Sequence, residues 1–97
     1  MFVIILKYIM PLEKVDALLP EHIEFLNGCY KKSELICSGK RNPRTGGVIL
    51  ANVGSEERVW ELIKQDPFFI HKIAEYEVIE FIPSKFDDRF ACFLEKK

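Results

Sequence analysis

The spacing of apolar positions changes several times along this 97-residue chain, and each change predicts a different element. Residues 2–9, FVIILKYI, are apolar at nearly every position, which is typical of a strand covered on both faces. From about residue 12 to residue 32 the apolar positions follow the period of a helix. Proline is favourable at the first position of a helix and costly inside one, so we expect the main helix to begin at Pro20, after one or two helical turns. The predicted inner face of this helix consists of Leu19, Ile23, Leu26 and Tyr30.

Three later runs rich in apolar residues predict strands over residues 35–40, 48–53 and 74–82. The loop RNPRTGG joins the first two and contains the proline and glycines that a hairpin turn requires. After the second of these strands, Ser55 is expected to cap a helix that extends to about Gln65. The predicted inner face of that helix consists of Val59, Leu62 and Ile63.

The sequence DPFF follows this second helix. Pro67 cannot extend an established helix, so we expect the helix to be interrupted there. Asp66 is a good helix cap and is predicted to start a new short turn before the fourth strand.

The predicted order β-α-β-β-α-β folds, with right-handed crossovers, as a four-stranded antiparallel sheet with both helices on one face. This is the ferredoxin-like α+β plan. The helices cover only one face of the sheet. The first and third strands, however, are apolar at successive positions and so carry apolar side chains on both faces. Leaving each of these side chains in water would cost about 1.5–3 kcal/mol. We therefore expect a homodimer that packs sheet against sheet. The alternative is that the C-terminal tail of the same chain covers this face. The residues that carry the argument are Val3, Ile4, Ile5, Leu6, Val48, Ile49 and Leu50.

The last residues, SKFDDRFACFLEKK, have phenylalanines at helical spacing. Ser84 and Asp87 resemble a capping box, which favours a helix. Phe90, Cys92 and Leu94 also alternate, so a strand is the alternative. Because the tail is rich in apolar residues, we expect it to dock on the body of the protein or on a partner.

The net charge of −1 argues against a nucleic-acid partner, because proteins that bind nucleic acids usually carry a basic surface that neutralises phosphates.

The apolar start of the chain has no preceding basic region and no small-residue cleavage site, and it is too short to cross a bilayer. We therefore expect a cytoplasmic protein with no membrane partner. The three cysteines show no metal-ligand spacing and are expected to be small buried hydrophobic residues in a reducing compartment.

Three segments of the chain resemble one known family: the start MFVIILKYIMPLEKVDALLPEHIEFL, the loop SGKRNPRTGGVILA and the segment LIKQDPFFIHKIAEYEVIEFIPSKF. They are similar to the YCII-related (YciI-like) family of the dimeric α/β-barrel superfamily. The resemblance covers about residues 1–86, and residues 87–97 look like an addition. It implies a ferredoxin-like homodimer whose cleft holds a histidine and an aspartate, which by position are His22 and Asp66.

A histidine–aspartate pair makes chemical sense, because a carboxylate bound to one imidazole nitrogen fixes the tautomer and makes the other nitrogen a better base. With no evident nucleophile, metal cluster or cofactor motif, the expected function is cofactor-free proton transfer on a small molecule, by isomerase, lyase or hydrolase chemistry. The structural alternatives are that His22 is a half-buried helix residue and that Asp66 is only a cap. The functional alternative is a non-catalytic dimer that binds a small metabolite or serves as an interaction platform.

Four further residues are candidates for binding the substrate. Arg44 can clamp an anionic group with its fork of donors, and Ser38 ends the second strand beside the expected cleft. Tyr8 and Phe68 are placed to wall an apolar pocket, whereas Trp60 is expected to pack in the core. His71 is expected at the surface.

The predicted architecture raises a geometric difficulty for the histidine–aspartate pair. The two helices run roughly parallel, so the start of the first and the end of the second should lie at opposite ends of the sheet, and the second helix, of about 11 residues, is about 16 Å long. Two arrangements would bring His22 and Asp66 together. Either helical turns before Pro20 shift His22 along the sheet, or the two residues meet across a dimer interface.

Overall fold

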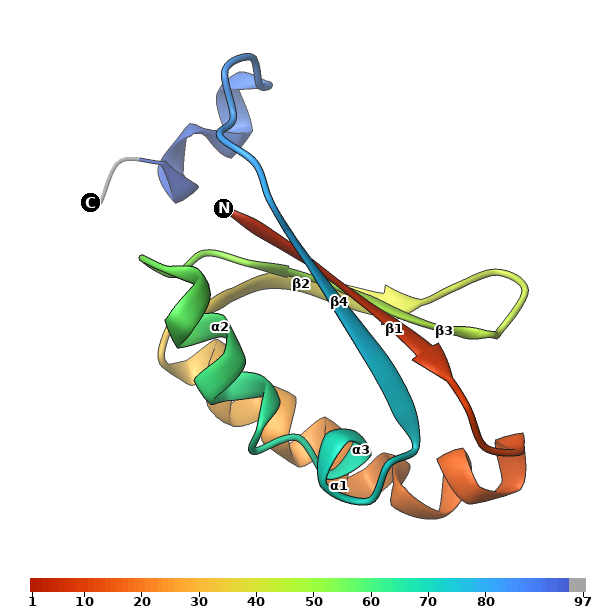
Figure 1. The fold of residues 1–97 in the computed structure, drawn as a ribbon. Coiled ribbons are helices and arrows are strands. Elements are labelled where there is room, and N and C mark those ends of the chain that lie inside the picture. The colour runs from red at the N-terminus through yellow and green to blue at the C-terminus, as the bar shows by residue number, and fades with distance from the viewer. Residues whose placement is uncertain (95–97) are drawn as a thin grey trace.

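The computed structural model describes residues 1–94, which form a four-stranded antiparallel sheet with helices packed on one face (Figure 1). The strand order is β2-β3-β1-β4, so β2 and β4 are the edges. This confirms the predicted ferredoxin-like α+β fold. No helix in the described part of the chain is long and apolar enough to cross a membrane. The strands are β1 (Phe2–Tyr8), β2 (Leu35–Lys40), β3 (Gly46–Ala51) and β4 (Ala74–Glu80).

Three α-helices cover the sheet, and the caps predicted at Ser55 and Asp66 are present. Ser55 accepts a hydrogen bond from the backbone N–H of Arg58, and Asp66 accepts one from the backbone N–H of Phe68. The inner face of the second helix, with Val59, Leu62 and Ile63, is buried as expected. The helices are α1 (Leu12–Lys31), α2 (Glu56–Ile63) and α3 (Pro67–Ile70).

Helix α1 does not begin at Pro20, as the sequence predicted, but at Leu12, and it runs through the proline. Two features explain this. Pro20 is exposed, so the carbonyl that it leaves without a helical partner faces water. The turns before it bury apolar surface, since Val15 is fully buried and Leu19 packs against the core, which offsets the roughly 3 kcal/mol cost of an internal proline.

Within one chain the sheet is covered on its helix side only. Phe2, Ile4 and Leu6 of β1 point toward the helices and are at most 2% exposed. On the other side, which we call the open face, Val48 is 40% exposed and Ile79 43%. The cross-strand register places on this face Val3, Ile5, Lys7, Cys37, Val48, Leu50, Glu75, Glu77 and Ile79.

The tail is helical, as the sequence favoured, and not a strand: it forms a 3-10 helix, η1 (Asp88–Phe93). Its cap is Asp87, which accepts from the N–H of Arg89, and the predicted capping box with Ser84 does not form. The tail docks beyond the end of the sheet, where Asn52 donates to the carbonyl oxygen of Phe93 at 2.7 Å (Figure 1). It therefore leaves the open face uncovered, and residues 95–97 of the predicted extension lie outside the described residues.

The prediction that all three cysteines are buried is wrong for two of them. Cys29 is buried on the inner side of α1, and its burial raises the pKa of the thiol. Cys37 is exposed because it lies on the open face of an edge strand, and Cys92 is exposed because η1 buries none of its side chains. All three are free thiols.

Gly46 generates a prediction about stability, because β3 begins where its backbone passes close to the carbonyl oxygen of Leu6. A Cβ at this position would collide with that oxygen, so Gly46→Ala is expected to lower the free energy of unfolding by about 3 kcal/mol. Gly28→Ala is the matched control: nothing lies near its Cβ position on the exposed side of α1, so it should stabilise the protein by up to about 1 kcal/mol. Urea unfolding measures both, and equal effects would contradict the close approach.

Candidate functional site

His22 and Asp66, which are 44 residues apart in sequence, meet within one chain. The Nδ1 atom of His22 donates to Oδ1 of Asp66 at 2.8 Å. The early start of α1 makes this possible, because it places His22 near the middle of the helix, level with the junction between α2 and α3 where Asp66 lies. The first of the two predicted arrangements is therefore the one observed.

The carboxylate of Asp66 is only 1% exposed and accepts hydrogen bonds from three elements. Oδ1 accepts from His22 of α1 and, at 3.0 Å, from the backbone N–H of Phe68 in α3. Oδ2 accepts from the hydroxyl of Tyr76 in β4 at 2.6 Å. Burial, together with the negative charge of Asp66, raises the pKa of Tyr76 far above its ordinary value, so this phenol stays protonated and remains a donor. Three donors offset the desolvation of a carboxylate at this depth.

Tyr76 was not among the predicted site residues. The signal that would have found it is the alternation of β4, in which Ala74, Tyr76 and Val78 share the helix side of the sheet. Tyr76 lies opposite Leu6 in the register of β1 and β4.

The ring of His22 is fixed by stacking as well as by its hydrogen bond. It lies parallel to the ring of Phe68, with centroids 4.1 Å apart and planes 5° apart. Tyr8 meets the same Phe68 edge to face at 6.1 Å. His22 is 8% exposed, and it is one of the residues that line a cavity.

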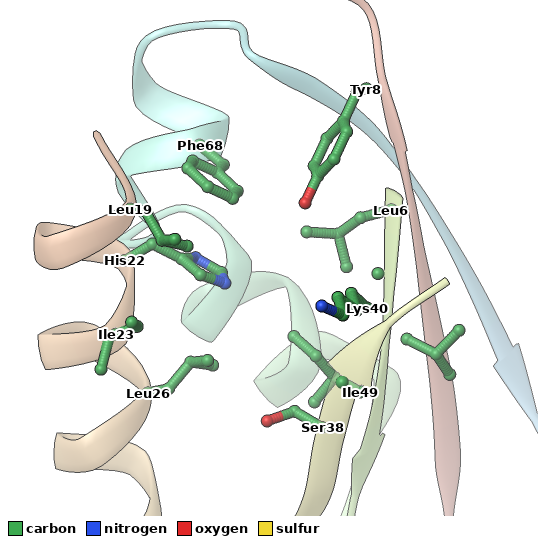
Figure 2. Close-up of a pocket in the computed structure, with 13 residues that line it drawn as sticks. Leu6, Tyr8, Leu19, His22, Ile23, Leu26, Ser38, Lys40, Ile49 and Phe68 are labelled. Atoms are coloured by element: carbon green, nitrogen blue, oxygen red, sulfur yellow. The ribbon is translucent and has the colours of Figure 1, made fainter. Parts of the chain in front are cut away.

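Beside His22 there is a cavity of about 160 Å³ between α1 and the sheet (Figure 2). Its walls are mostly apolar, which is typical of small-molecule sites that use a few polar groups for orientation. Figure 2 shows the hydroxyl of Tyr8 and the ammonium group of Lys40 projecting into the space that the His22 ring faces. The cavity is lined by Leu6, Tyr8, Leu19, His22, Ile23, Leu26, Ser38, Gly39, Lys40, Gly47, Val48, Ile49 and Phe68.

Three of the four predicted binding residues, Tyr8, Ser38 and Phe68, line this cavity. The hydroxyl of Ser38 lies 2.7 Å from that of Tyr30. Arg44 does not line the cavity, because its guanidinium pairs with Asp16 on α1. That hydrogen bond is the main reason why the pKa of Arg44 is raised, and the phenol of Tyr8 adds to it, so Arg44 lies just behind the Tyr8 wall.

Lys40 was also missed by the sequence analysis. It follows Ser38 by two residues on β2, and residues two apart on a strand share a face, so the strand period would have identified it. Outside the cavity, Trp60 packs partly buried against the core and His71 is exposed, as both were expected to be.

The site offers little to a metal ion. Among residues 1–94 no three or more His, Cys, Asp or Glu side chains are grouped as ligands. His22 and Asp66 are engaged with each other, and the ammonium group of Lys40 repels cations. The arrangement instead suits an organic molecule that places a proton near His22.

The sequence matches the family model of the YCII-related domain over residues 1–82. No curated protein matches the chain. The structure is similar to that of TftG, the 5-chloro-2-hydroxyhydroquinone dehydrochlorinase from Burkholderia phenoliruptrix, solved in complex with 2,5-dihydroxybenzoquinone. The TM-score is 0.71 at 17% sequence identity, over 87% of this chain and 96% of that one, which establishes a shared fold. Because the family model spans most of its length, this protein belongs to the YCII-related family.

Proposed function

We propose that this protein is an enzyme that transfers protons on a small organic molecule, with His22 as the general base and Asp66 as the residue that orients it. The observation that carries the proposal is the hydrogen bond from Nδ1 of His22 to the buried carboxylate of Asp66, beside an open cavity. A carboxylate only accepts, so Nδ1 carries the hydrogen and Nε2 of the neutral ring keeps a lone pair. Because the His22 ring stacks on the ring of Phe68, its plane is fixed, and so is the plane in which that lone pair lies.

The proposed reaction begins when Nε2 of His22 takes a proton from the substrate. The electron pair left behind forms a new double bond and expels an anionic leaving group, which is elimination, or the proton returns to another atom, which is isomerisation. Asp66 stabilises the imidazolium that forms in between, as a buried partner of a catalytic histidine does. No cofactor takes part in these steps, and removing a positioned base typically costs about 10²–10⁴ in rate.

A monocyclic substrate suits the size of the cavity. A closed apolar cavity of about 150 Å³ holds one benzene ring, and this site has about 160 Å³. The solved relative acts, by its name, on a chlorinated hydroxyhydroquinone, which is also a single ring. We therefore propose hydroquinones, quinones and related cyclic compounds as the substrate class, with Tyr8, Ser38 and Phe68 as binding residues.

The competing proposal is a binding protein that holds such a compound without turning it over. The half-enclosed, mostly apolar cavity supports both readings. What favours the enzyme is the buried carboxylate, because binding alone does not require an oriented histidine.

We further propose that the protein is a homodimer in which two open faces pack together. The centre of this face is apolar, with Val48 and Ile79 exposed, and its rim is charged. Lys7 lies opposite Glu75 in the strand register, so the rim carries both signs, as a two-fold symmetric contact requires.

The three free thiols suit a reducing compartment and support the proposal that the protein works in the cytoplasm.

The base can be tested by replacing His22 with glutamine. We expect His22→Gln to lower kcat by about 10²–10⁴ and to change KM little, because the base acts on the proton in transit. His71→Gln is the matched control, since the second histidine is exposed and outside the cavity. The assay follows chloride release and ring-proton exchange in deuterated water, by NMR, on chlorinated and unsubstituted hydroquinones. Turnover that is equal in His22→Gln and His71→Gln would refute the assignment, and ligand binding without turnover in every variant would favour the binding protein.

Tyr76 provides a second test, because it acts through Asp66. Tyr76→Phe leaves Oδ2 of Asp66 without its donor, so we expect a loss of about 1–3 kcal/mol in the free energy of unfolding at neutral pH and a lower kcat at unchanged KM. Burial raises the pKa of Tyr76 above its ordinary value of 10.0, so the wild-type protein should lose stability as the pH rises above about 10, where only the unfolded phenol ionises.

Urea unfolding of both proteins from neutral pH to pH 11 measures this difference, which should shrink as the pH rises. Tyr30→Phe is the control, because its hydroxyl bonds to the exposed Ser38 and to no other side chain of residues 1–94, and it should change the free energy of unfolding by less than about 0.5 kcal/mol. A gap between wild type and Tyr76→Phe that stays constant with pH would contradict the role given to Tyr76.

The dimer can be tested by placing a charge on the open face. Ile79→Glu is expected to convert a dimer into a monomer, because two copies would bury like charges beside Glu77. Ile70→Glu is the matched control, since Ile70 is 56% exposed on α3, on the other side of the sheet. Sedimentation velocity gives the masses. A wild-type monomer at concentrations where the protein is active would exclude the dimer.

A further inference from the structure

We infer that the cavity binds its ligand as an anion and that Lys40 is the residue that selects the charged form. The inference rests on the proposed function only in placing the ligand in the same cavity. Lys40 is the last residue of β2 and lies on the helix side of the sheet, across from Gly47 in the register with β3. Because Gly47 has no side chain, nothing from β3 stands between the lysine and the cavity.

The ammonium group of Lys40 has no carboxylate partner among residues 1–94. Figure 2 shows it directed into the space that His22, Tyr8 and Ser38 border. Lys40 is exposed and also lines the cavity, so its side chain reaches water and the ligand space at once. Its direction into a mostly apolar cavity leaves an unbalanced positive charge next to the ligand position.

The other charges around the cavity do not cancel this one. The cavity lining contains no Asp or Glu. Asp66 keeps its negative charge, because its three donors are neutral, but it lies behind the His22 ring on the helix side of the cavity and not on the wall that Lys40 lines. Asp16 is neutralised by Arg44, and Arg44 itself lies close to the hydroxyl of Tyr8. The potential is therefore most positive at the sheet wall beside Lys40, where an anionic group of a ligand gains most and a neutral one gains little.

The positions of the polar groups suggest which ligand atom is charged. The proton acceptor, His22, lies on α1, whereas Lys40, Ser38 and Tyr8 lie on the sheet, on the opposite wall. A ring held between the two walls would place an ionised oxygen, such as a phenolate, enolate or carboxylate, against the ammonium and hydroxyl groups. The negative charge that develops when His22 takes a proton would then be stabilised at the wall farther from the base. Lys40 thus determines specificity and also stabilises the charge that forms.

The experiment compares two ligands of nearly the same shape, benzoate and benzamide, at one pH by NMR titration. The wild-type protein should bind benzoate about tenfold more tightly than benzamide, as a charge-assisted hydrogen bond provides. Lys40→Met keeps the aliphatic stem and should abolish this preference by weakening benzoate alone. Lys40→Arg should restore it, and added salt should reduce it in the wild type. Lys85→Met is the matched control, because it removes the same charge from an exposed position in the tail.

The same titration with 2,5-dihydroxybenzoquinone, which ionises readily as a vinylogous acid, should show the same dependence on Lys40. Equal binding of benzoate and benzamide by the wild type, no binding of either, or a preference that survives in Lys40→Met would overturn the inference. The outcome is separable from that of the proposed reaction. His22→Gln should keep the preference for benzoate while losing turnover, so an inactive protein that still discriminates through Lys40 would refute the base and leave the anion site standing.

Discussion

A buried carboxylate with three hydrogen-bond donors is the constraint on which the rest of this structure depends. Asp66 lies where α2 ends and α3 begins, and it binds groups from α1, α3 and β4. A charge that is 1% exposed would be very unfavourable without all of these partners. The need of this carboxylate for hydrogen-bond donors therefore fixes three things together. These are the position of α1 along the sheet, the residue at which α3 begins and the burial of Tyr76. The position of α1 over the sheet, fixed in this way, also sets one wall of the cavity beside His22.

The fold and the site are connected in the same way at the sheet. The helix side carries the core and the cavity, whereas the open face carries the apolar residues that no helix covers. Each strand divides its residues between the two by simple alternation. On β2 this alternation separates the side chains of Ser38 and Lys40, which border the cavity, from that of Cys37 on the open face. The edge strand thus serves the ligand site with one set of side chains and the proposed dimer with the other.

The sequence was sufficient for the strands, the element order and the two caps, because apolar period and cap chemistry are local signals. It was insufficient wherever packing decided the outcome. The penalty for Pro20 is local, but the burial of Val15 that overcomes it depends on the whole core. His22 and Asp66 were identified by a family resemblance, and no local rule places residues 44 apart at 2.8 Å. Strand alternation would have placed Tyr76 and Lys40 on the helix side of the sheet, but that Tyr76 meets Asp66 and that Lys40 lines the cavity becomes known only once the helices pack on the sheet.

Comparing aspartate with asparagine at residue 66 separates what the fold requires from what a reaction would require. To cap α3, asparagine serves about as well as aspartate, since both offer an oxygen to the N–H of Phe68. Asparagine could also meet Tyr76 and His22 with its amide, and as a neutral group it would avoid the desolvation penalty that a carboxylate incurs at this depth. A carboxylate is thus more than the fold requires. What it adds is a negative charge against Nδ1 of His22, which favours a proton on the other ring nitrogen and so supports the proposed role of His22 as a base.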